Sequence, residues 1–151
     1  NAAVPFMELA RRNGRSIAII VADLDNFKMI NDTYGHQTGD RVLHATGRVF
    51  RETMRSSDLC GRYGGEEFIV LCPEITPGSA HHIAEKLRLA VDRLNPDALK
   101  VSISVGVIEA IPEDTMAAAE ELERLIKFAD ILLYDAKRSG KNGSKYQNFS
   151  F

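Results

Sequence analysis

The sequence predicts an α+β fold, an α/β sandwich with a mixed central sheet and helices on both faces. Two observations indicate the mixed sheet. Tyr63-Gly64-Gly65-Glu66 separates two short apolar runs, which is typical of an antiparallel hairpin because glycine accepts positive φ. Amphipathic stretches of helical length connect other apolar runs, as crossover connections do. In addition, neither a GxGxxG nor a GxxxxGKS/T phosphate loop occurs, which argues against Rossmann and P-loop folds.

The individual elements follow from hydrophobic periodicity. Residues 16–22 form a continuous β-branched apolar run, which predicts a central strand buried on both faces, and Asp23 follows at once. Apolar residues at helical spacing precede this strand and end at Asn13-Gly14. Asp40 is expected to be the N-cap or an early residue of a later helix. Further helices are predicted over 26–32, 40–54, 79–94 and 122–138, and strands over 58–62, 67–72, 101–107 and 144–147.

Composition limits the classes of function. The chain has 151 residues, with 19 Lys and Arg against 21 Asp and Glu, so its formal net charge is −2. A content of 44% hydrophobic and 26% charged residues excludes a disordered chain. The near-neutral balance argues against an extended nucleic-acid-binding face. We therefore expect a small anion bound in a pocket.

Compartment and domain organisation follow from what the sequence lacks. No apolar run approaches the ~18 residues of a spanning helix, so no membrane contact by this domain is expected. Cys60 and Cys72 form no CxxC pair, which favours a reducing cytoplasm. The chain opens abruptly at Asn1. We expect residues 1–151 to be one domain of a longer protein, which could be membrane-anchored.

Two groups of carboxylates suggest chemistry. Asp23-Leu24-Asp25 ends the buried strand, where a carboxylate can hold Mg²⁺ together with a substrate phosphate; the alternative is a helix N-cap. Glu66 and Glu67 follow the two hairpin glycines, which leave room for a substrate. Because neighbours on a strand face opposite sides, only one glutamate is expected to share a site with Asp23. The alternative is a solvated surface hairpin.

These residues resemble a known family. Residues 23–40, DLDNFKMINDTYGHQTGD, closely resemble the DxDxFKxINDxxGHxxGD segment of GGDEF domains, the diguanylate cyclases. Residues 62–68 resemble the name-giving motif in its GGEEF form, and residues 104–107, 129–130 and 133–137 match further family segments. The resemblance implies a fold like that of class III nucleotidyl cyclases and the polymerase palm. It also implies condensation of two GTP molecules into cyclic di-GMP, with release of two pyrophosphates.

The resemblance assigns the catalytic and metal-binding roles. Asp23 and Glu66 are the implied catalytic residues, and with the Leu24 carbonyl they would hold Mg²⁺, or Mn²⁺, at two ions per half-site. Glu67 is expected to face away, and Asp25 to be structural.

It also assigns the substrate residues. Asn31 and Asp40 would recognise guanine, with His36 nearby, because a carboxylate accepts from N1–H and the exocyclic amine. Lys137 and Lys141 would neutralise the triphosphate, although the family more often has Arg in place of Lys141; the alternative is a solvated basic helix end. The full implied set is Phe27, Lys28, Asn31, His36, Asp40, Gly64, Gly65, Lys137 and Lys141.

A second nucleotide site is implied by Arg55-Ser56-Ser57-Asp58, which matches the RxxD product-inhibition motif. Arginine can bond guanine O6 and N7 in pairs. Arg88 is a weaker candidate for the same pocket. The alternative is a surface Arg–Asp salt bridge.

The functional hypothesis is an active, product-inhibited diguanylate cyclase. The alternative is a catalytically silent module that binds GTP or cyclic di-GMP, and a third is a cyclase with relaxed base choice. Each site holds one GTP, so catalysis requires a transient homodimer, whereas the isolated domain is expected to be mostly monomeric. The resemblance also implies an unknown sensory or receiver domain before Asn1.

Overall fold

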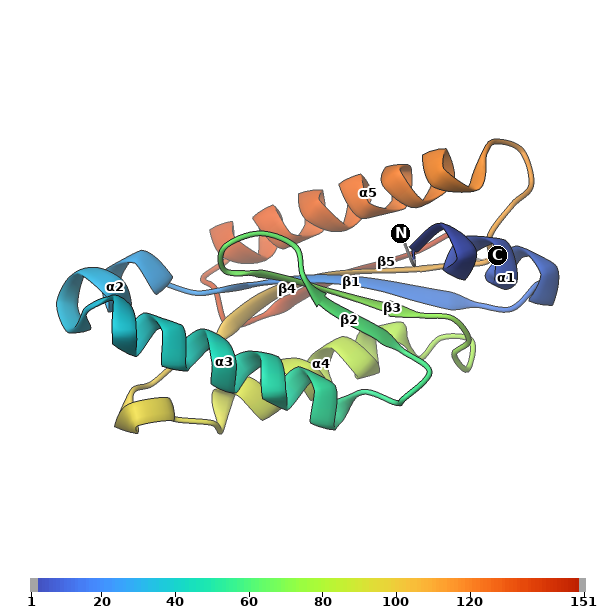
Figure 1. Cartoon of the computed structure of the whole chain (residues 1–151). Helices are drawn as coiled ribbons and strands as arrows, with labels where there is room; N and C mark the ends of the chain where they lie inside the picture. Colours follow the sequence, from blue (N-terminus) through green and yellow to red (C-terminus); the bar gives the residue numbers. More distant parts are fainter. Residues whose placement is uncertain (1–2, 150–151) are drawn as a thin grey trace.

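The computed structural model describes residues 3–149, which form a five-stranded sheet of order β2-β3-β1-β4-β5 (Figure 1). The central strand β1 pairs antiparallel with both β3 and β4, β2 pairs antiparallel with β3, and β5 runs parallel to β4. The strands are β1 (Ile17–Leu24), β2 (Leu59–Arg62), β3 (Glu67–Cys72), β4 (Ile103–Ala110) and β5 (Ser144–Asn148). The helices are α1 (Ala3–Asn13), α2 (Phe27–Tyr34), α3 (His36–Thr53), α4 (Ala80–Asp92) and α5 (Ala118–Arg138), with a short 3₁₀ helix at Pro96–Ala98.

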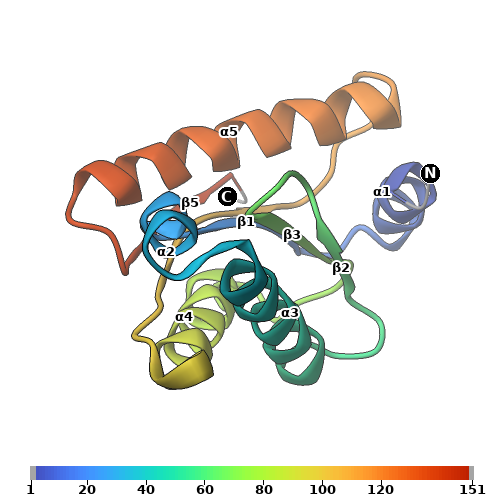
Figure 2. The same cartoon turned by 60° about the vertical axis from the view of Figure 1, so that its left-hand side comes forward.

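Helices cover both faces of the sheet, with α1 and α5 on one side and α3 and α4 on the other (Figures 1 and 2). Alternate residues of β1 supply the two cores: Ala18, Ile20 and Ala22 pack towards α3 and α4, whereas Ile17 and Ile19 pack towards α1 and α5. This confirms the predicted α/β sandwich with a mixed sheet. Along the described chain, no helix is both long and apolar enough to cross a membrane.

Several element boundaries differ from the predicted ones; helix α5, for example, begins at Ala118 and not at 122. Strand β1 runs on through Asp23 to Leu24, because both residues still pair with β4. Helix α3 begins at His36, directly after Gly35 at φ 93°, so Asp40 lies in its second turn and is not an N-cap. Strand β4 begins at Ile103 and is buried along its whole length.

The predicted hairpin between β2 and β3 is present, but the expectation that its glycines have positive φ was wrong. Neither Gly64 nor Gly65 has positive φ. The reason is the loop length: Tyr63–Glu66 forms a four-residue connection closed by the Tyr63 N–H on the Glu67 carbonyl (2.8 Å), with Arg62 Nη2 donating to the Gly65 carbonyl (2.9 Å). Positive φ is required at the central residues of two-residue turns of the primed types, and this longer connection is not such a turn.

Close packing at Gly106 fixes helix α5 on the sheet. A Cβ at this position would collide with the Ala129 carbonyl oxygen and the Leu133 nitrogen of α5. The helix therefore lies directly against the backbone of β4, and its C-terminal turn brings Lys137 to the end of β1.

Glu109 anchors helix α4. Its carboxylate on β4 is fully buried and accepts hydrogen bonds from the backbone N–H groups of Gly78 (2.7 Å) and Ala80 (3.1 Å). These N–H groups lie at the start of α4, where no intrahelical acceptor exists, and Ser79 makes no side-chain cap bond. A strand residue thus provides the cap and the favourable negative charge at this helix end.

Replacing Glu109 by Gln is expected to lower the free energy of unfolding by about 2–4 kcal/mol, because an amide cannot accept both N–H bonds in the buried site. Chemical denaturation measures the change. Glu52→Gln, at an exposed position on α3, is the control and should change stability by less than about 0.5 kcal/mol. An equal effect of the two changes would contradict the capping role.

Candidate functional site

The carboxylates singled out in the sequence meet where β1 ends and β3 and β4 begin. Because both neighbours are antiparallel to β1, Asp23 pairs with Glu67 on one side and with Ser104 on the other. The Leu24 N–H donates to the Glu66 carbonyl at 3.3 Å, which holds the hairpin loop against the strand end.

Asp23 is a partly buried carboxylate, with 17% of its side chain exposed, and it lacks a complete set of partners. Its Oδ1 has almost no exposed surface and no hydrogen bond, and the nearest cation is Lys137 Nζ at 3.7 Å. Burial raises the pKa of Asp23 to about 6; Lys137 lowers it, and Glu66 and Glu67 raise it further. An orphaned oxygen in a locally negative site fits a bound cation.

Lys137 contacts the oxygens that the sequence assigns to a metal. Its ammonium donates to the Leu24 carbonyl at 3.1 Å and approaches Asp23. Among residues 3–149 no three His, Cys, Asp or Glu side chains cluster in a way that could hold a metal ion by themselves. Mg²⁺ commonly takes one or two carboxylates and completes its shell with water and substrate phosphate, so Asp23, the Leu24 carbonyl and a hairpin glutamate fit it as a donor set.

The orientation of the two hairpin glutamates differs from the expectation. Alternation along a strand predicted that Glu67 would face away, but the register sets Glu67 directly across from Asp23, and opposite residues of an antiparallel pair share a face. Glu66 precedes β3 and lies in the loop, so strand alternation does not apply to it. Both glutamates raise the pKa of Asp23, with Glu66 the stronger influence.

Asp25 has the opposite environment to Asp23. It is buried and accepts hydrogen bonds from Ser102 Oγ (2.8 Å), Ser104 Oγ (2.6 Å), Lys137 Nζ (3.0 Å) and the Asn142 N–H (2.9 Å). Burial alone would raise the pKa of Asp25, but the bonds from Ser104, Asn142, Ser102 and Lys137 together bring it below its usual value. These contacts fit the predicted structural role.

The residues implied for the base form a second group at the start of α3. Asn31 lies against Gly39, since a Cβ there would collide with Asn31 Oδ1 and come within 3.2 Å of Phe27. Asp40, the next residue, lines a groove of about 580 Å³ along α3. The structure therefore brings Phe27 and Asn31 beside the turn that carries Asp40.

The remaining substrate candidates are exposed. His36 begins α3, and Lys28 pairs with Asp32 one turn later on α2 at 3.6 Å. Lys141 Nζ binds Asn26 Oδ1 at 2.6 Å, which brings it near the start of α2. Gly64 and Gly65 lie exposed at the hairpin tip.

The Arg55–Asp58 pair borders a separate pocket of about 200 Å³. Arg55 Nη2 binds Asp58 Oδ1 at 3.0 Å and also donates to the Glu74 carbonyl at 2.6 Å. The pocket is lined by Thr53, Met54, Arg55, Asp58, Ile75, Thr76, Ser79, Ile83 and Lys86.

Arg88, which was expected at the same pocket, is not among the residues that line it. Arg88 binds Glu85 and Asn142, away from Arg55, whereas Lys86 lines the pocket. Helical phase explains the difference, because Ser79, Ile83 and Lys86 share one face of α4 at spacings of four and three. That spacing was a signal available in the sequence.

Comparison with known proteins agrees with the geometry. The family model described as "Diguanylate cyclase, GGDEF domain" matches residues 5–143. Diguanylate cyclase DosC of Escherichia coli (strain K12) is 37% identical over 138 residues, 88% of this chain and 29% of that protein. Diguanylate cyclase A of Treponema denticola is 35% identical over 130 residues, 84% of this chain and 34% of that protein. The chain thus spans about a third of the length of these relatives.

Solved structures give the same relationship. The active GGEEF domain of a diguanylate cyclase from Vibrio cholerae superposes with a TM-score of 0.81 at 29% identity, covering 96% of this chain and 90% of that one. Diguanylate cyclase SiaD from Pseudomonas aeruginosa, solved with its activator SiaC, gives a TM-score of 0.83 at 37% identity, over 97% and 55% of the two chains. Because the family model matches residues 5–143 and these relatives are 35–37% identical over most of the chain, this chain belongs to the GGDEF-domain family of diguanylate cyclases.

Proposed function

We propose that residues 1–151 are one catalytic domain of a longer diguanylate cyclase, which condenses two GTP molecules into cyclic di-GMP and two pyrophosphates. The observation that carries the proposal is the intact acidic strand end, where partly buried Asp23 keeps an unbonded Oδ1 beside the Leu24 carbonyl and the hairpin glutamates. A bound divalent cation would supply the partner that this oxygen lacks.

The hairpin glycines support a ligand at the same place. Neither Gly64 nor Gly65 has positive φ, a Cβ at Gly65 would meet open space, and one at Gly64 would meet only Glu67 at 3.9 Å. The protein's own conformation and packing therefore do not require glycine here. Close approach of a substrate to the backbone explains both residues.

In the proposed reaction, the 3′-hydroxyl of each GTP attacks the α-phosphorus of the other. The new P–O bond forms as the bond to pyrophosphate breaks, and the hydroxyl proton passes to solvent water. Asp23, the Leu24 carbonyl and Glu66 would hold two Mg²⁺ or Mn²⁺ ions, which when bound supply positive charge at the attacking and leaving oxygens. Asn31 and Asp40 would bind guanine, and Lys137 and Lys141 the phosphates.

The assembly follows from the stoichiometry. One domain offers one set of these residues, so two domains must meet, at least transiently, for the two half-reactions. Because the relatives are about three times longer than the matched region, we propose that a further sensory or receiver domain brings the two copies together. GTP as substrate implies a cytoplasmic reaction.

The catalytic assignment is tested with purified protein, GTP and Mg²⁺, as the single domain and as a tethered dimer. Cyclic di-GMP formation by the parent is expected, and Asp23→Asn and Glu66→Gln should each reduce it at least about a hundredfold, because each removes a metal ligand. Mn²⁺ should raise the melting temperature of the parent but not of Asp23→Asn.

Glu8→Gln, at an exposed position on α1, is the control and should keep full activity. If the tethered parent forms no cyclic di-GMP but binds GTP or cyclic di-GMP, the silent binding module is correct instead.

Gly39→Ala tests the base pocket without substituting any residue that is proposed to contact guanine. The new Cβ displaces Asn31, so binding of α,β-methylene GTP should weaken about three- to tenfold. Stability should change by less than about 1 kcal/mol, because alanine favours a helix and the displaced side chain is flexible. Calorimetry measures both quantities.

Gly47→Ala on the same helix meets only ordinary contacts, the nearest being Arg51 at 3.5 Å, and is the control. Unchanged nucleotide binding in Gly39→Ala would contradict the role of Asn31.

The Arg55–Asp58 pocket is proposed as the site of product inhibition, with Lys86 contributing positive charge. A solved GGDEF domain of DgcB from Caulobacter crescentus was crystallised with cyclic di-GMP, which supports a product site in the family. Arg55→Ala should weaken cyclic di-GMP binding about tenfold or more and relieve inhibition, because bidentate guanine contacts are lost. Initial rates of the tethered dimer should be unchanged; a fall in those rates to the same extent would place Arg55 in the active site.

A further inference from the structure

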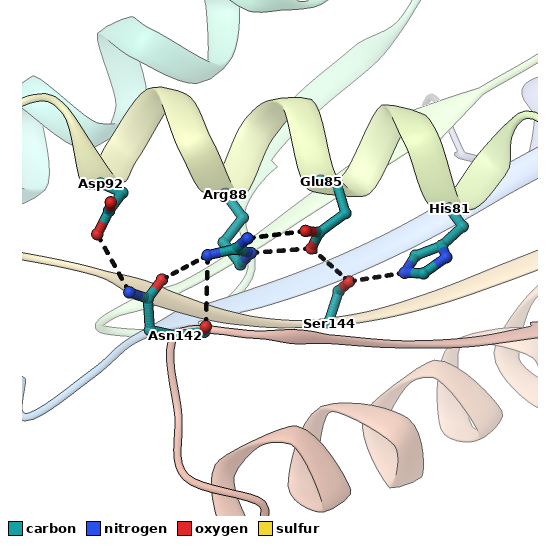
Figure 3. Close-up of polar contacts among 6 residues, drawn as sticks. All are labelled: His81, Glu85, Arg88, Asp92, Asn142 and Ser144. Carbon is teal, nitrogen blue, oxygen red and sulfur yellow. Dashed lines mark hydrogen bonds and ion pairs between the residues drawn. The ribbon is translucent and has the colours of Figure 1, made fainter.

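Arg88 joins helix α4 to the loop between α5 and β5. Its guanidinium donates to both carboxylate oxygens of Glu85, at 2.8 and 2.7 Å, and its third nitrogen reaches Asn142 Oδ1 at 2.9 Å (Figure 3). The Asn142 amide in turn donates to Asp92 Oδ1 at 3.1 Å. We call this set the α4 clamp; it consists of Glu85, Arg88 and Asp92 with Asn142 and Ser144.

Hydrogen bonds to Ser144 also hold the part of the α4 clamp near His81. Ser144 Oγ donates to Glu85 Oε2 at 2.6 Å and lies 3.0 Å from His81 Nε2. Arg88 is mostly buried, with 16% of its side chain exposed. Hydrogen bonds from Arg88, and then from Ser144, lower the pKa of Glu85 to about 2 despite its partial burial. Glu85 is therefore ionised at neutral pH and holds Arg88 in one orientation.

The loop that the clamp holds has an unfavourable backbone. Lys141 and Asn142 have φ of 63° and 41°, a left-handed conformation that is unfavourable for lysine and that asparagine adopts more readily than most residues. Such a conformation persists only where surrounding contacts determine it. The two bonds of the Asn142 side chain, to Arg88 and Asp92, are such contacts.

From Asn142 the contacts lead to the active site. In this loop conformation the Asn142 N–H donates to Asp25 Oδ2, and Asp25 Oδ1 binds Lys137 Nζ. Lys141, next to Asn142, reaches Asn26. The positions of both lysines that are proposed to bind the triphosphate thus depend on the loop that Arg88 holds.

We propose that Arg88 is a positioning residue for nucleotide phosphate binding, acting through Asn142 on Asp25, Lys137 and Lys141. The inference rests on the proposed function, since it concerns the GTP site. Lys86 lies two residues earlier, roughly 200° around the helix, and lines the Arg55–Asp58 pocket. One face of α4 therefore serves the product pocket and the other serves the substrate site.

Two substitutions on α4, each of which removes one positive charge, test the roles of the two faces separately. Arg88→Met keeps the aliphatic stem but removes every clamp bond of the guanidinium, and Lys86→Met is its matched control. Affinities are measured by calorimetry for α,β-methylene GTP, which cannot release pyrophosphate, and for cyclic di-GMP. Arg88→Met should weaken binding of the GTP analogue about five- to twentyfold and change cyclic di-GMP binding less than about twofold. Lys86→Met should weaken cyclic di-GMP binding about five- to twentyfold and change binding of the GTP analogue less than about twofold.

A graded series separates positioning from loss of stability. Arg88→Lys keeps the charge but can reach only one of its two partners, so its affinity for the analogue should fall between those of the parent and Arg88→Met. Asn142→Ala removes the side chain that Arg88 holds but keeps the N–H that binds Asp25. Because alanine does not favour the positive φ of this position, the change should weaken binding of the analogue at least as much as Arg88→Met does.

Amide hydrogen exchange, followed by NMR on the unliganded protein, gives a readout independent of nucleotide. Exchange at Asn142 should speed up at least about fivefold in Arg88→Met and stay unchanged in Lys86→Met. The inference is overturned if Arg88→Met binds the analogue as the parent does, if Asn142 exchange is unaltered, or if cyclic di-GMP binding falls instead. A parent that binds no GTP analogue at all overturns the proposed function, and with it the phosphate-binding role of Arg88.

Discussion

The buried carboxylate of Asp25 is the point at which four separate parts of the chain meet. It follows β1 and accepts bonds from Ser102 and Ser104 at the start of β4, from Lys137 on α5, and from Asn142 before β5. In a low-dielectric interior such a network is rigid when complete and costly when broken. The positions of the strand end, the last turn of α5 and the Lys141–Asn142 loop therefore depend on this one anion.

Asp23 and Asp25 are two residues apart and have opposite environments. The four donors satisfy Asp25 and keep its pKa below the usual value, whereas Asp23 keeps an unbonded oxygen and burial raises its pKa to about 6. The separation gives one carboxylate a structural task and leaves the other able to take an external cation. Lys137 lies between them and contacts both, so the same ammonium links the structural and the reactive group.

Much of the architecture could be predicted from local patterns. The apolar run of β1 is the central strand, the hairpin joins β2 and β3, and helical spacing identified α4 and α5, because periodicity reports which face is buried. The errors at the candidate site concern relations between elements. Glu67 was expected to face away from Asp23, and its position depends on strand register, which local periodicity does not specify. Arg88 was associated with the Arg55 pocket, although the helical spacing of α4 already separates it from Lys86.

The sequence by itself determined the types of element and the chemistry available: an acidic strand end, a glycine hairpin and an Arg–Asp motif in the order of the GGDEF family. Only the tertiary structure decided which of these groups meet. Asn142 reaches Asp25 across 117 residues, and Arg88 reaches Asn142 across 54. Such contacts exist because Gly106 lets α5 lie on β4 and Glu109 caps α4, and both depend on packing between segments that are distant in the chain.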